Sequence, residues 1–285
     1  MPAELNLRRR ARRELDLDPR LTRRVLEAFI RDEIEKFGIQ RAVVALSGGI
    51  DSAVSCALAA RAFGPERVLA VLMPYRTSNP ASRGDAETLV DQLGIPSRLI
   101  EISATVDGLL GELDDDPGPL RRGNIMARAR MIALYDQSEA FGGLVVGTSN
   151  KTELLLGYGT QFGDMASAVN PIGDLYKTQV RALAAALDIP SAIREKAPSA
   201  DLWVGQSDED ELGFDYETAD QLLYLLIDEM YAPADLIADG FDPDLVHDLQ
   251  RRVVRSQFKR RLPLIAKLSN RTIDRDFRYP RDWGR

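Results

Sequence analysis

A short run of serines, glycines and one aspartate, Ser47-Gly48-Gly49-Ile50-Asp51-Ser52, directly follows the apolar stretch 42–46. The apolar stretch is typical of a buried strand, and the alanine-rich stretch 53–60 is typical of a helix. The two glycines permit a sharp turn and let a ligand approach the main chain closely. Backbone N–H groups at a helix N-terminus attract anions, and the two serines add hydroxyl donors. The pattern therefore predicts a phosphate-binding loop.

Asp51 is the acidic residue of this predicted loop. A carboxylate would repel a bare phosphate, so its place indicates a metal ion between Asp51 and the phosphate. The loop has no lysine and is therefore not a Walker A site. An ordinary strand–turn–helix joint is the alternative interpretation, but the accompanying serines and aspartate favour the phosphate site.

A second polar stretch, 148–153, follows another predicted strand and ends at Glu153. Glu153 lies just past a strand end, as Asp51 does, and two such carboxylates could share Mg²⁺, the usual partner of ATP phosphates. The alternative is a helix start with a threonine or serine as its cap and Glu153 in its first turn. Taken with the first loop, the stretch favours a metal site formed by Asp51 and Glu153.

Two further residues are candidates because of where they lie in the sequence. The stretch 156–172 is too rich in glycine and too long for an ordinary connection, which indicates a functional loop, and Asp164 lies in its middle. Lys177 lies at the start of a predicted helix, 176–187, where a cation does not compensate the helix dipole. A phosphate partner would explain its position, and a solvated lysine is the alternative.

The elements that must position these residues are strands alternating with helices. Continuous apolar strands indicate burial on both faces, and this predicts an α/β fold with a doubly wound parallel sheet and helices on both faces. Right-handed crossovers place the loops after Leu46, Met73 and Val146 at one edge of the sheet. The predicted strands are 42–46, 68–73, 97–102 and 143–148.

The 285 residues are expected to form a single domain with three parts. Residues 1–17 carry an arginine cluster flanked by acidic residues, which predicts a solvated helical arm. Residues 18–200 form the α/β core. Residues 201–285 form an acidic lid loop and a C-terminal helical extension, in which the apolar surface of 222–227 is wider than one stripe.

The charge balance and the cysteine count limit the class of protein. The formal net charge of −7 argues against nucleic-acid binding, which needs clustered lysine and arginine. The single cysteine, Cys56, excludes a disulfide within the chain, and with the single histidine it excludes a zinc site of cysteine and histidine alone. Cys56 is expected to be a small buried hydrophobe. No apolar run approaches the ~20 residues that span a bilayer, which favours a cytoplasmic protein with no membrane partner.

The loop 47–52 resembles the pyrophosphate loop of the N-type ATP pyrophosphatases, which cleave ATP between its α and β phosphates. With the other motifs in place, the chain resembles the ammonia-dependent NAD synthetases from about Leu21 to its end. That resemblance implies an adenine nucleotide α-hydrolase-like fold and a homodimer. The segments that carry it are 47–52, Gly123-Asn124-Ile125-Met126-Ala127-Arg128, 147–153, Gly163-Asp164, Pro198-Ser199-Ala200-Asp201 and Phe258-Lys259-Arg260.

The resemblance also implies a reaction, in which ATP adenylates the nicotinate carboxylate of deamido-NAD and ammonia then displaces AMP. Asp51 and Glu153 would bind Mg²⁺, Lys177 would stabilise phosphate charge, and Asp164 would accept a proton from ammonium. The implied catalytic residues are thus Asp51, Asp164 and Lys177. The implied ATP-binding residues are Ala45, Leu46, Ser47, Gly48, Gly49, Ile50, Asp51, Ser52, Thr148, Lys177 and Ser199. Deamido-NAD would contact Asn124, Arg128 and Asp164, with Phe258 and Lys259 contributed by the partner subunit.

Three positions depart from the better-known bacterial pattern of that family. Leu72 stands where an arginine often follows the second strand, and Gln161 and Ala168 replace a lysine and an aspartate that often contact the dinucleotide. The roughly 40 residues before the first strand are too few for an amidase domain of typical size. Ammonia is therefore the expected nitrogen source, either directly or through another protein.

Two other interpretations are considered. A tRNA thiolase or lysidine synthetase would share the phosphate loop, but a thiolase usually needs additional cysteines and either enzyme needs a basic RNA surface. A nucleotide-binding module without catalysis would share the fold. The pairing of Asp51 with Glu153 argues against such a module, because a binder has no need of a metal poised at the leaving group.

Overall fold

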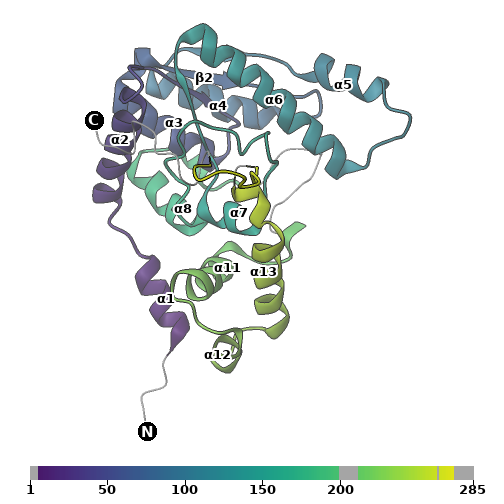
Figure 1. Ribbon diagram of the computed structural model, residues 1–285. Coiled ribbons are helices and arrows are strands. Elements are labelled where there is room, and N and C mark those ends of the chain that lie inside the picture. Colours follow the sequence, from purple (N-terminus) through teal and green to yellow (C-terminus); the bar gives the residue numbers. More distant parts are fainter. Residues whose placement is uncertain (1–5, 199–210, 262, 273–285) are drawn as a thin grey trace.

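The computed structural model describes residues 6–198, 211–261 and 263–272 (Figure 1). Its centre is a sheet of four parallel strands in the order β3-β2-β1-β4. Val43 in β1 pairs with Leu69 in β2 and with Val145 in β4. The parallel, doubly wound sheet expected from the sequence is confirmed. The strands are β1 (Ala42–Ala45), β2 (Val68–Leu72), β3 (Ser97–Leu99) and β4 (Leu144–Val146).

Alternate residues of a strand point to opposite faces of the sheet, and helices pack on both faces. Val44 packs in a core with one group of helices, whereas Val43 packs in a second core with the other group. The first group is α2 (Pro19–Glu35), α3 (Ile50–Phe63), α4 (Pro80–Leu93), α8 (Lys177–Ala186) and α9 (Ser191–Arg194). The second is α5 (Ser103–Gly111) and α6 (Pro119–Phe141), while a short η1 (Pro65–Arg67) leads into β2.

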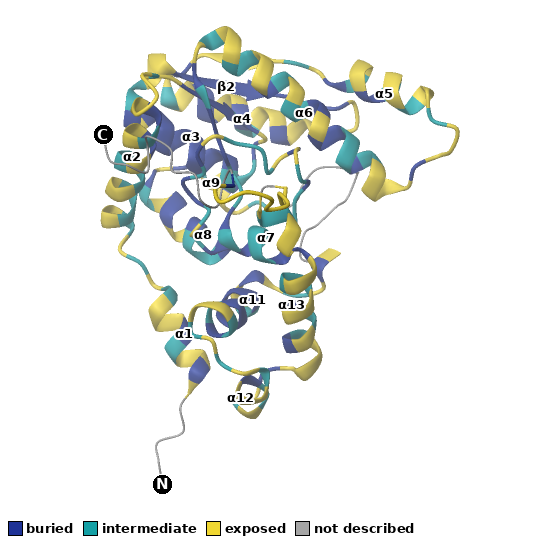
Figure 2. Cartoon of the chain, in the orientation of Figure 1, coloured by how far each residue is buried: buried dark blue, intermediate teal, exposed yellow. Residues whose placement is uncertain are grey.

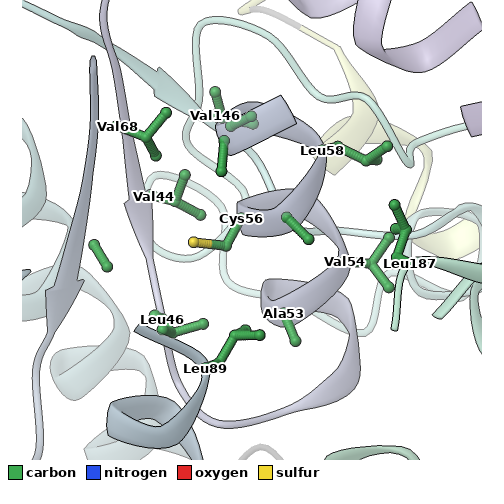
Figure 3. Close-up of a cluster of buried hydrophobic side chains, with 14 of the residues drawn as sticks. Val44, Leu46, Ala53, Val54, Cys56, Leu58, Val68, Leu89, Val146 and Leu187 are labelled. Atoms are coloured by element: carbon green, nitrogen blue, oxygen red, sulfur yellow. The ribbon is translucent and has the colours of Figure 1, made fainter. Parts of the chain in front are cut away.

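Helix α3 is buried almost all round, which fits the alanine-rich sequence after the glycines. Figure 3 shows the Cys56 thiol among apolar side chains, including Val44 and Leu46. Burial raises the pKa of Cys56 to about 12, so the thiol stays protonated and inert at neutral pH. The prediction that Cys56 is a small buried hydrophobe is confirmed.

A separate helical group packs below α7 and α8, as Figure 1 shows. Its own core includes Leu222, Leu223 and Leu225, all fully buried. The wide apolar surface expected at 222–227 is therefore largely covered within the chain. The group packs against α7 (Lys151–Leu156) and consists of α11 (Tyr216–Leu223), a π-helical turn η2 (Tyr224–Asp228), α12 (Pro233–Ala238), α13 (Pro243–Arg255) and a 3₁₀ turn η3 (Gln257–Arg260).

The N-terminal arm is helical, and Arg8, Arg9, Arg12 and Arg13 are exposed as predicted, but one face of the arm is docked. Helix α1 (Leu7–Leu15) buries Leu7 and Ala11 against the helical group. The guanidinium of Arg8 lies 4.2 Å from the centre of the Phe241 ring, and Arg10 pairs with Glu229. The docking was not predicted, because two apolar residues spaced among arginines are enough to form such a face.

Helix α2 has one buried face and one exposed apolar face. Asp18 caps the helix, and Ile30 and Ile34 are fully buried. However, Leu21 and Val25 are each 56% exposed and Phe29 is 38% exposed. The apolar stripe thus continues onto a face that the described part of the chain leaves open (Figure 2).

Within the described residues, no helix combines the length and the apolar character needed to cross a bilayer. The predicted lid loop falls mainly on 199–210, which lies outside the described residues. The division of the chain into the parts 1–17, 18–200 and 201–285 stays a prediction.

Candidate functional site

The predicted phosphate loop lies at the carboxyl end of β1, where open α/β sheets bind ligands. Gly48 has φ +78°, and a Cβ at this position would collide with the main-chain oxygen of Ser82. Only glycine fits both constraints. Gly49 begins α3, and no side chain among the described residues caps this helix start. The dipole of α3 and its first amides thus face the loop.

Side-chain hydroxyl groups brace the loop from inside. Ser47 N donates to Ser52 Oγ at 3.2 Å, and Gly49 N donates to Ser47 Oγ at 3.2 Å. Ser52 Oγ in turn donates to Gly49 O at 2.9 Å. The two serines therefore hold the loop in shape in addition to offering hydroxyl groups. Leu46 and Ile50 are buried in the core, so only their main chain is available to a ligand.

Asp51, Glu153 and Lys177 meet beside this loop, although they come from three different helices. Lys177 Nζ donates to Asp51 Oδ2 at 2.5 Å and to Glu153 Oε1 at 3.3 Å. The lysine side chain is only 3% exposed, whereas the carboxylates are 16% and 17% exposed. The solvated-lysine alternative is therefore wrong: Lys177 is a buried cation bridging two carboxylates.

Asn150 links the two carboxylates and was missed in the sequence. Its Nδ2 donates to Asp51 Oδ1 at 2.9 Å, and its Oδ1 accepts from Glu153 N at 2.9 Å. Asn150 N donates back to Glu153 Oε2 at 3.3 Å, which completes a capping box on α7. The helix start of the alternative interpretation is therefore present, with Glu153 in its first turn and Asn150, in place of a threonine or serine, as its cap. The spacing Asn-x-x-Glu was a local signal for it.

The fit of Mg²⁺ can be judged from the donor set alone. Two carboxylates already share one cation here, the Lys177 ammonium. Among the residues that the structure describes, no group of three or more acidic, cysteine or histidine side chains could hold a metal. Mg²⁺ binds through one or two carboxylates and completes its shell with water and substrate phosphates. Asp51 and Glu153 fit a metal that arrives with a nucleotide.

Asp164 lies in the glycine-rich loop, next to the carboxyl ends of the strands. Its Oδ1 accepts from Thr160 N at 2.6 Å, and Thr160 Oγ1 donates to Asn124 Oδ1 at 2.8 Å. Surrounding protein raises the pKa of Asp164 by desolvation, only partly offset by backbone hydrogen bonds and by Lys259 and Arg130. The residue as a whole is nevertheless exposed.

Two cations lie around the same loop. Arg128 Nη2 donates to Gln161 O at 3.2 Å, and Lys259 Nζ donates to Gly157 O and Gly159 O, both at 2.8 Å. Burial lowers the pKa of Lys259, and the nearby Asp164 opposes this shift. The Lys259 predicted to come from a partner subunit thus already lies at this loop within one chain.

Other predicted residues occupy less informative positions. Thr148 follows β4 and is half-buried, and Phe258 is 62% exposed on η3. Ser199 lies outside the described residues. Leu72 ends β2 in the core, whereas Ala168 is exposed and its N donates to Val145 O at 2.9 Å.

Known proteins resemble this chain over most of its length. The family model described as NAD synthase matches residues 22–263. The chain belongs to the NAD synthase family. It is 55% identical to the NH(3)-dependent NAD(+) synthetase of Trichlorobacter lovleyi over 271 residues, which is 95% of this chain and 99% of that protein.

Two solved structures share the fold of this NAD synthase family member. The NH3-dependent NAD synthetase of Campylobacter jejuni superposes with a TM-score of 0.76 at 34% identity, covering 88% of this chain and 100% of that one. The NMN synthetase of Francisella tularensis gives 0.79 at 32% identity, covering 88% and 99%. The expected adenine nucleotide α-hydrolase-like fold is therefore confirmed.

Proposed function

We propose that this NAD synthase family member catalyses the ammonia-dependent amidation of deamido-NAD, with ATP cleaved to AMP and pyrophosphate. The observation that supports this best is the meeting of Asp51, Glu153 and Lys177 at the open start of α3. A polyphosphate leaving group needs amides, a cation and metal-binding carboxylates in one place, and this corner holds all three.

In this proposal the loop 47–52 receives the β and γ phosphates of ATP. The amides at the start of α3 and the hydroxyl groups of Ser47 and Ser52 face the leaving pyrophosphate. Lys177 stabilises the charge that develops on it. Bound Mg²⁺, held by Asp51 and Glu153, would supply further neutralisation of that charge.

The ammonia step is assigned to Asp164. Its raised pKa makes it a stronger base than an ordinary aspartate, and its solvent-open position lets ammonium reach it. The carboxylate binds ammonium and takes one proton, so that neutral ammonia attacks the adenylated nicotinate. Asn124, Arg128 and Lys259 surround the same loop and are proposed to hold the dinucleotide.

The direct test is an assay with deamido-NAD, Mg·ATP and either ammonium or glutamine. We expect NAD, AMP and pyrophosphate with ammonium. Release of ADP, or no turnover of deamido-NAD, would reject the proposal. Asp51→Asn should abolish adenylation while circular dichroism remains native, and full activity of this variant would remove Asp51 from the metal site.

The same assay should include nicotinic acid mononucleotide as a competing substrate, because the Francisella tularensis relative is named as an NMN synthetase. The amidated carboxylate is the same in both compounds. We propose the dinucleotide because the proteins that are more than half identical to this chain are named as NAD synthetases. A higher kcat/KM for the mononucleotide would reverse that choice.

We also propose a homodimer and a cytoplasmic location. The open apolar face of α2, formed by Leu21, Val25 and Phe29, supports a second copy as its occupant. Val25→Glu places a charge in that face and should convert a dimer into a monomer in sedimentation analysis. A wild-type chain that sediments as a monomer at micromolar concentration would reject the dimer.

A further inference from the structure

We infer that Tyr216 and Asp220, one turn apart on α11, are positioning residues that hold Lys177 at the leaving-group site. Neither residue belongs to the phosphate loop, the metal pair or the ammonia loop described above. The inference rests on the proposed function in one respect: it takes Lys177 to act on the phosphates of ATP.

Asp220 is a fully buried carboxylate that holds the start of α8. Its Oδ2 accepts from Thr178 N at 2.8 Å, and its Oδ1 accepts from Thr152 Oγ1 at 2.6 Å. Thr152 Oγ1 also accepts from Lys177 N at 3.0 Å. The first two amides of α8 are therefore capped by side chains of α11 and α7, although the residue that precedes α8, Tyr176, supplies no side-chain cap.

The cap matters because Lys177 is the first residue of α8. A helix start with uncapped amides frays, and the side chain of its first residue then loses its fixed position. The negative charge of Asp220 also offsets the positive end of the α8 dipole and interacts favourably with Lys177. Burial raises the pKa of Asp220, and the hydrogen bonds from Thr152 and Thr178 oppose that shift.

Tyr216 acts on the other end of the lysine. It is 1% exposed, and Lys177 Nζ lies 5.2 Å from the centre of its ring. A cation over an aromatic face in a dry environment is attracted to the ring, while the ring also excludes water from one side of the ammonium. Helix α11 therefore controls both the main chain and the ammonium of Lys177 through residues at i and i+4.

The experiment is a double-mutant cycle on the rate of adenylation, measured in single turnovers with Mg·ATP and deamido-NAD and without ammonia. Asp220→Ala should lower this rate at least tenfold and change the apparent Kd of ATP much less. In a Lys177→Ala background, the same substitution should lower the rate less than twofold further, because the lysine it positions is absent.

The outcomes separate the inference from the function on which it rests. If Lys177→Ala adenylates at the wild-type rate, the proposed role of Lys177 fails and this inference fails with it. If Lys177→Ala is slow but Asp220→Ala lowers the rate by the same factor in both backgrounds, only the positioning role is overturned. Coupling in the cycle supports the inference.

Three further variants distinguish a positioning role of Asp220 from a general loss of protein stability. Gln221→Ala removes a buried polar side chain next to Asp220 on the same helix and should lower the melting temperature without the loss of rate. Thr152→Val should reproduce the Asp220→Ala defect, and Thr152→Ser, which keeps the hydroxyl group, should restore the rate. If Asp220→Ala fails to fold, the Thr152 pair replaces it in the cycle, and equal rates for the two Thr152 variants would overturn the inference.

Discussion

Replacing Lys177 by methionine should make the free protein bind a divalent cation more tightly. In the wild-type structure the Lys177 ammonium already lies between Asp51 and Glu153, at 2.5 and 3.3 Å. A metal that enters without nucleotide must displace it. Methionine keeps much of the side-chain length but removes the charge, so two carboxylates remain without their common cation.

The magnitude follows from these distances. At an effective dielectric constant of about 20, each contact corresponds to roughly 5–7 kcal/mol of Coulomb attraction before desolvation. Measured losses on breaking buried pairs are smaller, about 3–5 kcal/mol. Water entry and partial protonation of one carboxylate would reduce this loss of free energy. If about 2 kcal/mol remains for an incoming metal, its affinity rises about thirtyfold.

The assay is a titration of Mn²⁺ into the nucleotide-free protein, followed by electron paramagnetic resonance of the unbound ion. Lys196→Met is the matched control, because Lys196 pairs with the single carboxylate of Asp85 at 2.8 Å. The affinity of the Lys196→Met variant for Mn²⁺ should stay at the wild-type value. Equal or weaker binding by Lys177→Met than by wild type would refute the competition between lysine and metal.

Three other substitutions test separate parts of the structure. Asp164→Asn should leave adenylation intact and slow the ammonia step at least a hundredfold. In the pH–rate profile of the wild-type ammonia step, the rate should begin to fall with decreasing pH above the ordinary range of an aspartate pKa. Desolvation raises the pKa of Asp164, and its proton-accepting form exists only above that pKa. Gly48→Ala should lower the melting temperature well beyond Gly49→Ala, since Gly48, unlike Gly49, combines a positive φ with a main-chain collision. Leu7→Ala should cost about 2–4 kcal/mol in chemical denaturation, because Leu7 of α1 is 4% exposed and packs in the core of the helical group, whereas the exposed Arg9→Ala should cost almost nothing.

The sheet and the phosphate loop could be predicted because their signals are local. Three of the four strands, β1, β2 and β4, are short apolar runs of mostly buried residues, so each is recognised as a strand without knowledge of its neighbours, whereas β3 is an exposed strand at the edge of the sheet. The loop at Gly48 combines glycines, serines and an aspartate within six residues. Parallel topology then brings Asp51 and Glu153 to one edge, and Asn150 indeed joins them across 99 residues of sequence.

The partners of Lys177 could not be predicted in the same way. Thr152 and Asp220 are 68 positions apart, and Thr178 and Asp220 are 42 apart. An aspartate within a helix reads as a solvated residue unless the helix that covers it is known. The docking of α1 and the exposure of the apolar stripe of α2 could not be predicted for a related reason. Periodicity shows which face of a helix is apolar, but not what covers that face.

The charges at the site explain why metal and nucleotide should enter together. Asp51 and Glu153 carry two negative charges, and the Lys177 ammonium cancels one of them. ATP without metal is strongly anionic and would be repelled by the remainder, while metal without ATP meets an occupied site. In the proposed function Mg·ATP would avoid both costs, because Asp51 and Glu153 would hold the metal while Lys177 would contact the phosphates. The free protein is thus partly neutralised by its own cation, and in the proposed function substrate binding is an exchange of partners around Lys177.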